Sequence, residues 1–401
     1  MLKLINIENP VVIRIIYVAV LLLVNVIVAN GQNLLETKMI EAGFENVKTV
    51  EESDRFLIFA EGTAYVNKER AFSVLKEIVE NDSGLKNKNI ELVILNNGIQ
   101  VARFKAVSGK VAQDYKWVRD IKYKSDKLVL SNTDRKKGVL LNENRWRADL
   151  KFYPQFRFKN SRLDRMYVLQ LNLNPTFELN MWKGAKLTTQ LIIPVYNEYS
   201  LEEGRVRPGF VTISQHVRLP GNFHVMATAG NFNMFRTGAD VKLFKQVTPK
   251  AGIYGQIGIT GWSVPMFQKW LFYDFGQISW RVGANYYLPQ KKVLANLNIS
   301  RYLENDIAVR GELIRYFRNT SVGFYVQSLQ YEGYLINGGF FFSVKLPPYK
   351  HNRKKWMRIT TGDNFSVEYI ARPYPQRGRF YFTSPDESSS LNFFNKLLIG
   401  N

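Results

Sequence analysis

The chain has 401 residues and no cysteine, which excludes disulfides, thiolate metal sites and a cysteine nucleophile. Aromatic residues make up 14% of the chain, and its formal net charge is +21. After the N-terminal 31 residues there is no run of 18 consecutive apolar residues, which excludes a transmembrane helix in the remainder.

The first 31 residues have the pattern of a secretory signal peptide. Lys3 and Arg14 precede an apolar run that extends to Val28, and Ala29 and Gly31 fit the −3 and −1 positions of a cleavage site. An uncleaved N-terminal anchor is the alternative. The pattern predicts an exported protein, and the lack of cysteine suits an envelope protein that does not depend on oxidative folding.

Charge is distributed unevenly along the chain. Residues 1–31 carry a net charge of +1, residues 32–112 a net charge of −1 and residues 113–401 a net charge of +21. A basic surface favours anionic partners such as nucleic acid, anionic lipid or acidic polysaccharide. Because export past the inner membrane argues against nucleic acid, we expect lipopolysaccharide and anionic polysaccharide as partners.

Residues 32–112 are predicted to form a small α/β unit with the order α-β-β-α-β-β. The spacing of apolar residues predicts helices over 33–44 and 67–81, with a strand over 55–66 between them. Residues 90–107 have the pattern of a hairpin whose strands join at Asn-Asn-Gly. We expect a two-layer sandwich that binds partners or packs on a neighbouring domain, and it contains no catalytic constellation.

A connector is predicted over 113–144, and from 145 to 346 the chain alternates with period two. The stretch "YVLQLNLNPTFELNM", residues 167–181, is apolar at its odd positions. Its even positions are mostly polar and include Gln170, Asn172, Asn174 and Glu178. Twelve such segments with no helix between them indicate an antiparallel all-β unit. We expect the aromatic stretch 262–275 to be a long loop.

Three features favour a membrane barrel over a soluble sandwich. One face of residues 336–346 is apolar, with Phe341 as an exception on the opposite face. The polar faces carry amides suited to a hydrated lumen. Aromatic residues gather near strand ends, as in an interfacial girdle: Trp146, Trp182, Tyr196, Tyr286 and Tyr287. Since lipid satisfies no backbone hydrogen bonds, only a helix or a closed sheet spans it.

The predicted fold is therefore dominated by β structure. We expect an antiparallel outer-membrane β-barrel of about 12 strands (10–14) preceded by the small α/β domain, with the four polar residues of 167–181 in the lumen. The basic segment 347–401 is predicted to add two strands, over 358–371 and 378–384. Its run "KHNRKK" is either a solvated loop near lipid head groups or part of an anion site.

Several motifs resemble the YjbH family, which comprises Gram-negative outer-membrane proteins tied to exopolysaccharide production. The motifs are "RYL" at 301–303, "VRGELIRYF" at 309–317, "SVGF" at 321–324, "GGFFFS" at 338–343 and the strand end "LIIPVYNE" at 191–198. The two helical segments of the α/β unit are also similar to the family's N-terminal unit. The resemblance covers most of residues 32–350, although this chain is shorter than the long members of the family, which carry a second strand-rich half. It implies export, assembly or tethering of a secreted polysaccharide, with no established catalysis.

Basic and aromatic residues on the strands are the candidate binding residues. Arginine grips carboxylates and phosphates bidentately, and aromatic faces stack on sugars. The predicted polysaccharide or anion site comprises Arg310, Lys345, Arg281, Arg236, Tyr325 and Gln327. None of the three histidines lies in a pattern with other metal-ligating residues, so neither a metal nor a cofactor is expected.

The leading hypothesis is a non-enzymatic outer-membrane barrel of a Gram-negative cell, with its α/β domain in the periplasm, serving exopolysaccharide or capsule export alongside other secretion proteins. A general small-solute porin is one alternative. The other is an outer-membrane lipid hydrolase, because Ser214 and His216 lie on one face of one strand. A glycosidase pair is not indicated, since Glu178 and Glu312 are far apart in sequence.

Overall fold

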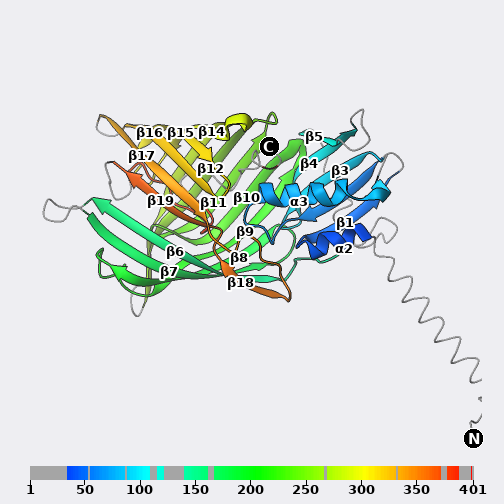
Figure 1. Ribbon diagram of the computed structural model, residues 1–401. Coiled ribbons are helices and arrows are strands. Elements are labelled where there is room, and N and C mark those ends of the chain that lie inside the picture. The colour runs from blue at the N-terminus through cyan, green and yellow to red at the C-terminus, as the bar shows by residue number, and fades with distance from the viewer. Residues whose placement is uncertain are drawn as a thin grey trace, which may run out of the picture.

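The computed structural model describes residues 34–52, 55–85, 88–108, 115–121, 140–160, 167–265, 269–330, 333–371, 377–387 and 399. The predicted signal peptide lies outside these residues. Most of the chain is strand, as the sequence predicts, and the strands form a five-stranded and a fourteen-stranded sheet (Figure 1). None of the helices in the described ranges has the length and apolar character of a membrane span.

The N-terminal α/β unit has the order α-β-β-α-β-β and then one further strand. Its elements are α2 (Leu34–Glu41), β1 (Glu45–Glu51), β2 (Phe56–Glu61), α3 (Lys68–Glu80), η1 (Ser83–Leu85), β3 (Ile90–Asn96), β4 (Ile99–Ser108) and β5 (Tyr115–Arg119). Strands β2 and β3 are parallel, and the other neighbours are antiparallel. The sequence analysis placed β5 in the connector; it pairs with β4, and Trp117 donates to Glu80 at 2.6 Å.

Local sequence explains the two best-defined features of this unit. The side chain of Asn67 caps α3 by accepting hydrogen bonds from the backbone N–H groups of Glu69 and Arg70. The β3–β4 hairpin turns at Asn97 and Gly98, whose φ angles of 47° and 71° suit a two-residue turn of this type. The predicted hairpin at Asn-Asn-Gly is therefore confirmed.

The large sheet begins with twelve strands, each paired antiparallel with the next in sequence. They are β6 (Ala148–Asn160), β7 (Tyr167–Asn180), β8 (Ala185–Asn197), β9 (Arg207–Leu219), β10 (Phe223–Phe232), β11 (Arg236–Gln246), β12 (Ala251–Pro265), β13 (Trp270–Leu288), β14 (Val293–Arg301), β15 (Ile307–Tyr316), β16 (Thr320–Gln330) and β17 (Tyr334–Lys345). Short 3-10 turns η4 (Pro220–Asn222) and η5 (Pro289–Lys291) join two of the hairpins.

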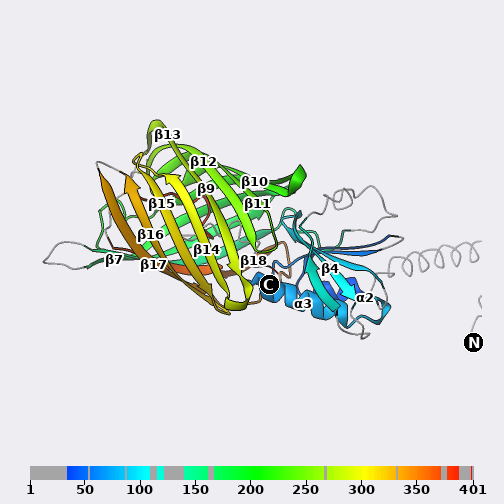
Figure 2. The same cartoon turned by 90° about the horizontal axis from the view of Figure 1, so that it is seen from above.

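The two edge strands of the large sheet come from one chain segment. β18 (Met357–Thr361) pairs parallel with β6, and β19 (Asn364–Ile370) pairs antiparallel with β17. Only Gly362 and Asp363 separate these two strands. The sheet is strongly curled, so its edges approach each other (Figures 1 and 2), and the rings of Phe158 on β6 and Tyr369 on β19 stack 5.9 Å apart.

The faces of the curled sheet are polar inside and apolar outside. On β7 the even residues from Val168 to Glu178 are buried on the concave face, whereas Leu171 and Leu173 on the odd face are each 40% exposed. The predicted outward direction of the odd residues is confirmed. The same alternation runs through β17, where Ile336 is 68% exposed and Phe341 is buried.

Three expectations need correction. The stretch 262–275 is not a long loop, because Trp262 to Pro265 pair with Trp270 to Tyr273 and extend β12 and β13 beyond a bulge. Residues 378–384 form no strand and lie against the concave face instead. Tyr287 is not part of an outer girdle, because its ring is buried with Phe341 in an aromatic cluster inside the sheet.

The α/β unit packs against one end of the curled sheet (Figure 1). The turn between β7 and β8 contacts the β3–β4 hairpin, where the Gly184 N–H donates to the Asn97 carbonyl at 2.9 Å. Arg353 joins the two parts by ion pairs of 2.8 Å each to Glu45 of β1 and Asp149 of β6. Because all three side chains are largely withdrawn from water, removal of any one of them would leave an uncompensated buried charge at this contact.

Candidate functional site

The concave face of the large sheet carries the predicted lumen residues. Gln170, Asn172, Asn174 and Glu178 are all buried there. The amides pair with neighbours on β6, as in the 2.8 Å bond from Asn172 to Gln155. Glu178 is held by two lysines, Lys151 and Lys186, each 3.3 Å away. This face is therefore a hydrogen-bonded polar lining rather than a packed apolar core.

Residues 377–387, here called the inner segment, lie across the interior enclosed by the sheet. Its Gly378 N–H donates to Asp306 in the β14–β15 loop at 2.6 Å, and its Phe382 N–H donates to Asn233 after β10 at 2.6 Å. At its other end Asp386 accepts a hydrogen bond from Tyr153 of β6. Contacts with strands on several sides show that the segment crosses the interior.

Polar and aromatic contacts with β10–β12 anchor the middle of the inner segment. The Tyr381 hydroxyl donates to Asp240 at 2.8 Å, and the Tyr381 ring stacks on Phe232 with centroids 5.1 Å apart. Lys242 donates to Thr383 at 2.8 Å and forms an ion pair with Glu387. The β12 strand leaves space for Tyr381 at Gly258, where an added Cβ would lie 1.7 Å from the tyrosine oxygen.

An arginine-rich cavity of about 230 Å³ lies beside the inner segment, at the end of the sheet opposite the α/β unit. We call it the arginine cavity. Its charged lining comprises Arg157, Arg207, Arg281, Arg310, Glu368 and Arg379. Phe380 of the inner segment also lines it, and the Arg281 guanidinium lies 4.5 Å from the centre of that ring.

Arg310 is the most strongly held of these arginines. It pairs with Glu312 at 2.7 Å and with Glu368 at 3.3 Å, and its guanidinium lies 3.6 Å from the Tyr325 ring centroid. Gln327 accepts from Arg310 at 3.4 Å. The structure thus brings three predicted site residues together, but two carboxylates already neutralise the charge of Arg310.

The other predicted binding residues are divided among different places. Arg281 lines the arginine cavity, whereas Arg236 stacks 4.6 Å over Trp262 and does not line it. Lys345 lies eight residues further along β17 than Asn337, the partner of Gln327 in the sheet. Arg310 is in turn the partner of Gln327, so at about 3.3 Å per residue Lys345 lies about 26 Å along the strands from Arg310. The prediction of a single site around Arg310 and Lys345 is therefore wrong.

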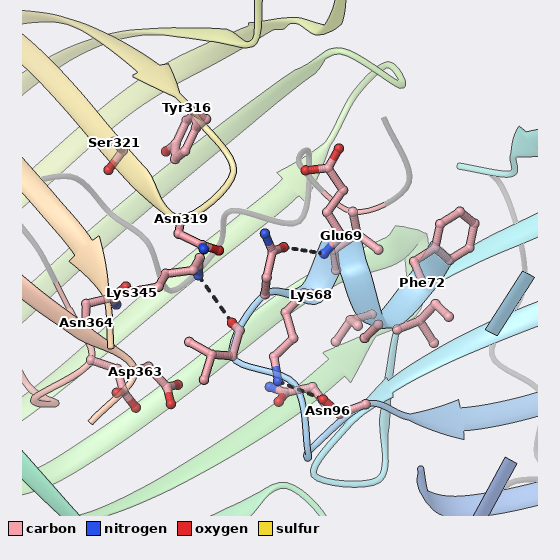
Figure 3. A pocket seen from close by; sticks show the side chains of 18 of the residues that line it. Lys68, Glu69, Phe72, Asn96, Tyr316, Asn319, Ser321, Lys345, Asp363 and Asn364 are labelled. Carbon is pink, nitrogen blue, oxygen red and sulfur yellow. Dashed lines mark hydrogen bonds between the residues drawn. The ribbon is translucent and has the colours of Figure 1, made fainter. Parts of the chain in front are cut away.

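Lys345 belongs to a second cavity of about 330 Å³ between the α/β unit and the sheet end (Figure 3). We call it the junction cavity. Lys345 donates to the Val66 carbonyl at 3.2 Å, and Lys68 at the start of α3 donates to the carbonyls of Gly62 and Tyr65 at 3.1 and 3.2 Å. Lys345 therefore joins the sheet to the α/β unit, whereas the hydrogen bonds of Lys68 stay within that unit.

Burial dominates the electrostatics on the α/β side of this junction. It lowers the pKa of Lys68, against the opposing charges of Asp363 and Glu61. It likewise raises the pKa of Glu61, although the backbone N–H groups of Asn97 and Gly98 donate to that carboxylate. These shifts follow from loss of solvation around both charged groups.

The residues of the hydrolase alternative are not arranged as a catalytic pair. The Ser214 hydroxyl donates to the Lys186 carbonyl at 3.3 Å. His216 turns its Nε2 to the Nδ1 of His224, 3.2 Å away. Within the described ranges, no group of three or more metal-ligating side chains comes together.

Sequence reasoning missed Arg157, Arg207 and Arg379 as cavity residues. Arg157 has a usable signal, because it falls on the polar face of an alternating strand near its end. Arg207 has none, because it shares the parity of Ile213 and Val217 and is buried only beyond a shift in the β8–β9 pairing. Arg379 has none, since it lies in a segment predicted to be a strand of the sheet. Compared by sequence, the chain matches no known protein family and no curated protein. The resemblance to the YjbH family stays a prediction.

Proposed function

We propose that the protein is an outer-membrane β-barrel of a Gram-negative cell that takes part in exopolysaccharide export. In this proposal strands β6–β19 close into a ring, and the segment that carries β18 and β19 forms the seam. The observation that carries it is the inverted sheet, with amides and charges on the concave face and leucine, isoleucine, valine and phenylalanine on the convex face. Such a surface is stable where lipid replaces water outside the sheet.

The lengths of the connections support this orientation. At the end that contacts the α/β unit, the links between consecutive strands β7–β16 are three or four residues long, whereas those at the opposite end are three to nine residues long. Outer-membrane barrels have short periplasmic turns and longer extracellular loops. The α/β unit then lies in the periplasm, in agreement with the predicted signal peptide.

Exposed aromatic residues at both ends of the strands also support a membrane position. Those near the α/β unit include Trp146, Trp182 and Tyr286, which are 56%, 50% and 46% exposed. Tyr167, Tyr196 and Tyr334 at the opposite end are 53%, 51% and 82% exposed. Rings with one apolar and one polar side favour the lipid–water interface.

The interior suits a hydrated polymer better than an apolar ligand. Amides, charges and aromatic rings line the arginine cavity, and sugars bind through hydroxyl hydrogen bonds and ring stacking. The inner segment and the α/β unit both lie in the path through the sheet, so transport requires them to move. We infer that a periplasmic secretion partner acts on the α/β unit, and we assign the protein no enzymatic role.

A general porin is the second candidate, because a polar concave face also suits a water-filled channel. The two roles are separated in a strain that lacks the gene. The export proposal expects secreted polysaccharide to fall at least tenfold while uptake of small sugars and antibiotics is unchanged. Intact secretion together with slower solute uptake would replace export with the porin function.

A further inference from the structure

The arginine cavity holds more positive than negative charge. Five arginines line it, and three carboxylates pair with or approach them in the described part of the chain: Glu203, Glu312 and Glu368. Glu203 pairs with Arg157 at 2.8 Å, and the other two pair with Arg310. Two positive charges remain in excess among the described residues, and Arg207, Arg281 and Arg379 are the arginines of the cavity without a close ion pair there.

Two of these three arginines have unused donors. The Nε–H groups of Arg281 and Arg379 are buried and have no hydrogen-bond partner among the described residues. A buried donor on a cation is costly to leave unsatisfied. Both arginines line the same cavity, and Arg281 stacks over the ring of Phe380, the residue that follows Arg379.

The shape and the remaining lining indicate the class of ligand. Phe232, Tyr302 and Phe380 place aromatic rings in the lining, and Asn231, Asn233, Gln155 and Gln190 lie around the same cavity. A volume of about 230 Å³ lies below the roughly 300–1,000 Å³ of drug-sized ligand sites, which suits one sugar unit at a time. Amides for hydroxyl groups, an aromatic lining and excess guanidinium charge together fit an acidic sugar.

We propose that the arginine cavity binds the carboxylate of a uronic acid unit in the exported glycan, with Arg281 and Arg379 as its two ligands. This inference rests on the proposed export function. A planar carboxylate pairs side-on with Nε–H and one Nη–H of a guanidinium, and Nε–H is the unused donor on both arginines. Glu203, Glu312 and Glu368 leave these two groups for an external anion.

The test uses the full chain, purified in detergent, and isothermal titration with tri-galacturonate. Maltotriose is the neutral ligand, and inorganic phosphate probes for a phosphate site. We expect tri-galacturonate binding that weakens as salt is raised, and at least a tenfold loss in Arg281→Gln/Arg379→Gln. Arg281→Lys/Arg379→Lys keeps both positive charges but lacks the paired N–H donors of a guanidinium group, so it should recover only part of the affinity.

Arg315→Gln/Arg318→Gln is the matched control, because it removes the same charge from exposed positions near the α/β unit. Heat-dependent gel mobility checks that each variant is folded. Unchanged tri-galacturonate affinity in Arg281→Gln/Arg379→Gln, equal binding of maltotriose, or preferential binding of phosphate would overturn the inference. Binding is measured on purified protein, so a loss of tri-galacturonate affinity in Arg281→Gln/Arg379→Gln supports the binding site whether or not the export function holds. Intact secretion after deletion of the gene would refute only the export function.

Discussion

Phe158 of β6 stacks on Tyr369 of β19, with ring centroids 5.9 Å apart and ring planes at 15°. Tyr369 also stacks on Phe340 of β17, 5.3 Å away. The first and last strands of the twelve-strand run therefore meet through one aromatic side chain. This contact forms where the parallel pairing of β18 with β6 has ended, so it holds the two edges together without backbone hydrogen bonds.

Phe158→Ala and Tyr369→Ala should be coupled. Aromatic pairs contribute about 0.5–1.5 kcal/mol beyond their buried area, so a double-mutant cycle of guanidinium unfolding in lipid vesicles should give a coupling energy of that size. Phe158→Ala combined with Phe324→Ala, an exposed ring on β16, should be additive. Additivity in both cycles would show that the seam contact contributes nothing.

Labels at neighbouring positions of β7 should lie in different environments. The chain has no cysteine, so Leu171→Cys and Asn172→Cys each take a single fluorescent label. In vesicles, lipid-borne quenchers should reduce the emission at position 171 and leave position 172 nearly unchanged, because side chains alternate across the sheet. Equal quenching at both positions would contradict the lipid-facing convex surface.

Gly258→Val should displace the inner segment. A Cβ at this position would lie 1.7 Å from the Tyr381 oxygen, and the bond to Asp240 would be lost. We expect a several-fold higher ion conductance than wild type in planar bilayers. Gly255→Val is the control on the same strand, since its Cβ meets nothing closer than 3.8 Å. If the two variants conduct alike, the inner segment is not what blocks the interior.

Ser214→Ala should leave any lipid-hydrolysing activity of a purified sample unchanged. The hydroxyl of Ser214 donates to the Lys186 carbonyl, and the ring of His216 faces His224. A nucleophile needs its base within hydrogen-bond reach. Release of fatty acid from phospholipid vesicles is the measurement, and complete loss of a robust activity in this variant would favour the hydrolase.

Lys183, in the turn beneath the β3–β4 hairpin, should react with acylating reagents at unusually low pH. Burial, with a smaller effect of Arg218, lowers the pKa of Lys183 to about 8. In the unfolded chain the pKa of a lysine is about 10.4. Between pH values of about 8 and about 10.4 the unfolded chain therefore binds more protons than the folded chain. The contribution of Lys183 to the free energy of unfolding therefore rises with pH over that window, and the destabilisation is complete below pH 8.

Mass spectrometry of acetylated protein measures this difference. At pH 8 the ratio of Lys183 to Lys250 modification should be several-fold higher in folded than in denatured protein, Lys250 being an exposed turn lysine at the same end. Arg218→Gln should reduce the ratio, because the second cause of the shift is removed. An identical ratio in folded and denatured samples would rule out the lowered pKa.

The alternating pattern alone predicted the strands and the direction of their side chains. Successive residues of a strand point to opposite faces, so Leu171 and Asn172 are separated by backbone geometry that needs no information from the rest of the chain. The Asn97–Gly98 turn is predictable for the same reason, because both residues tolerate the required positive φ. These signals depend only on residues that are close together in sequence, so they can be recognised without the tertiary structure.

Only the tertiary structure decided which side chains meet across the interior enclosed by the large sheet. Lys242 and Glu387 are 145 positions apart and pair because the chain, after completing the sheet with β19, turns back through it. Alternation in residues 378–384 predicted a strand, but Phe380 and Tyr381 bury their rings against side chains of distant strands instead. Arg310 was singled out by its charge, yet Glu312 and Glu368 neutralise it, whereas Arg379 was overlooked. Charge is a property of the sequence, but its compensation depends on neighbours that folding brings together.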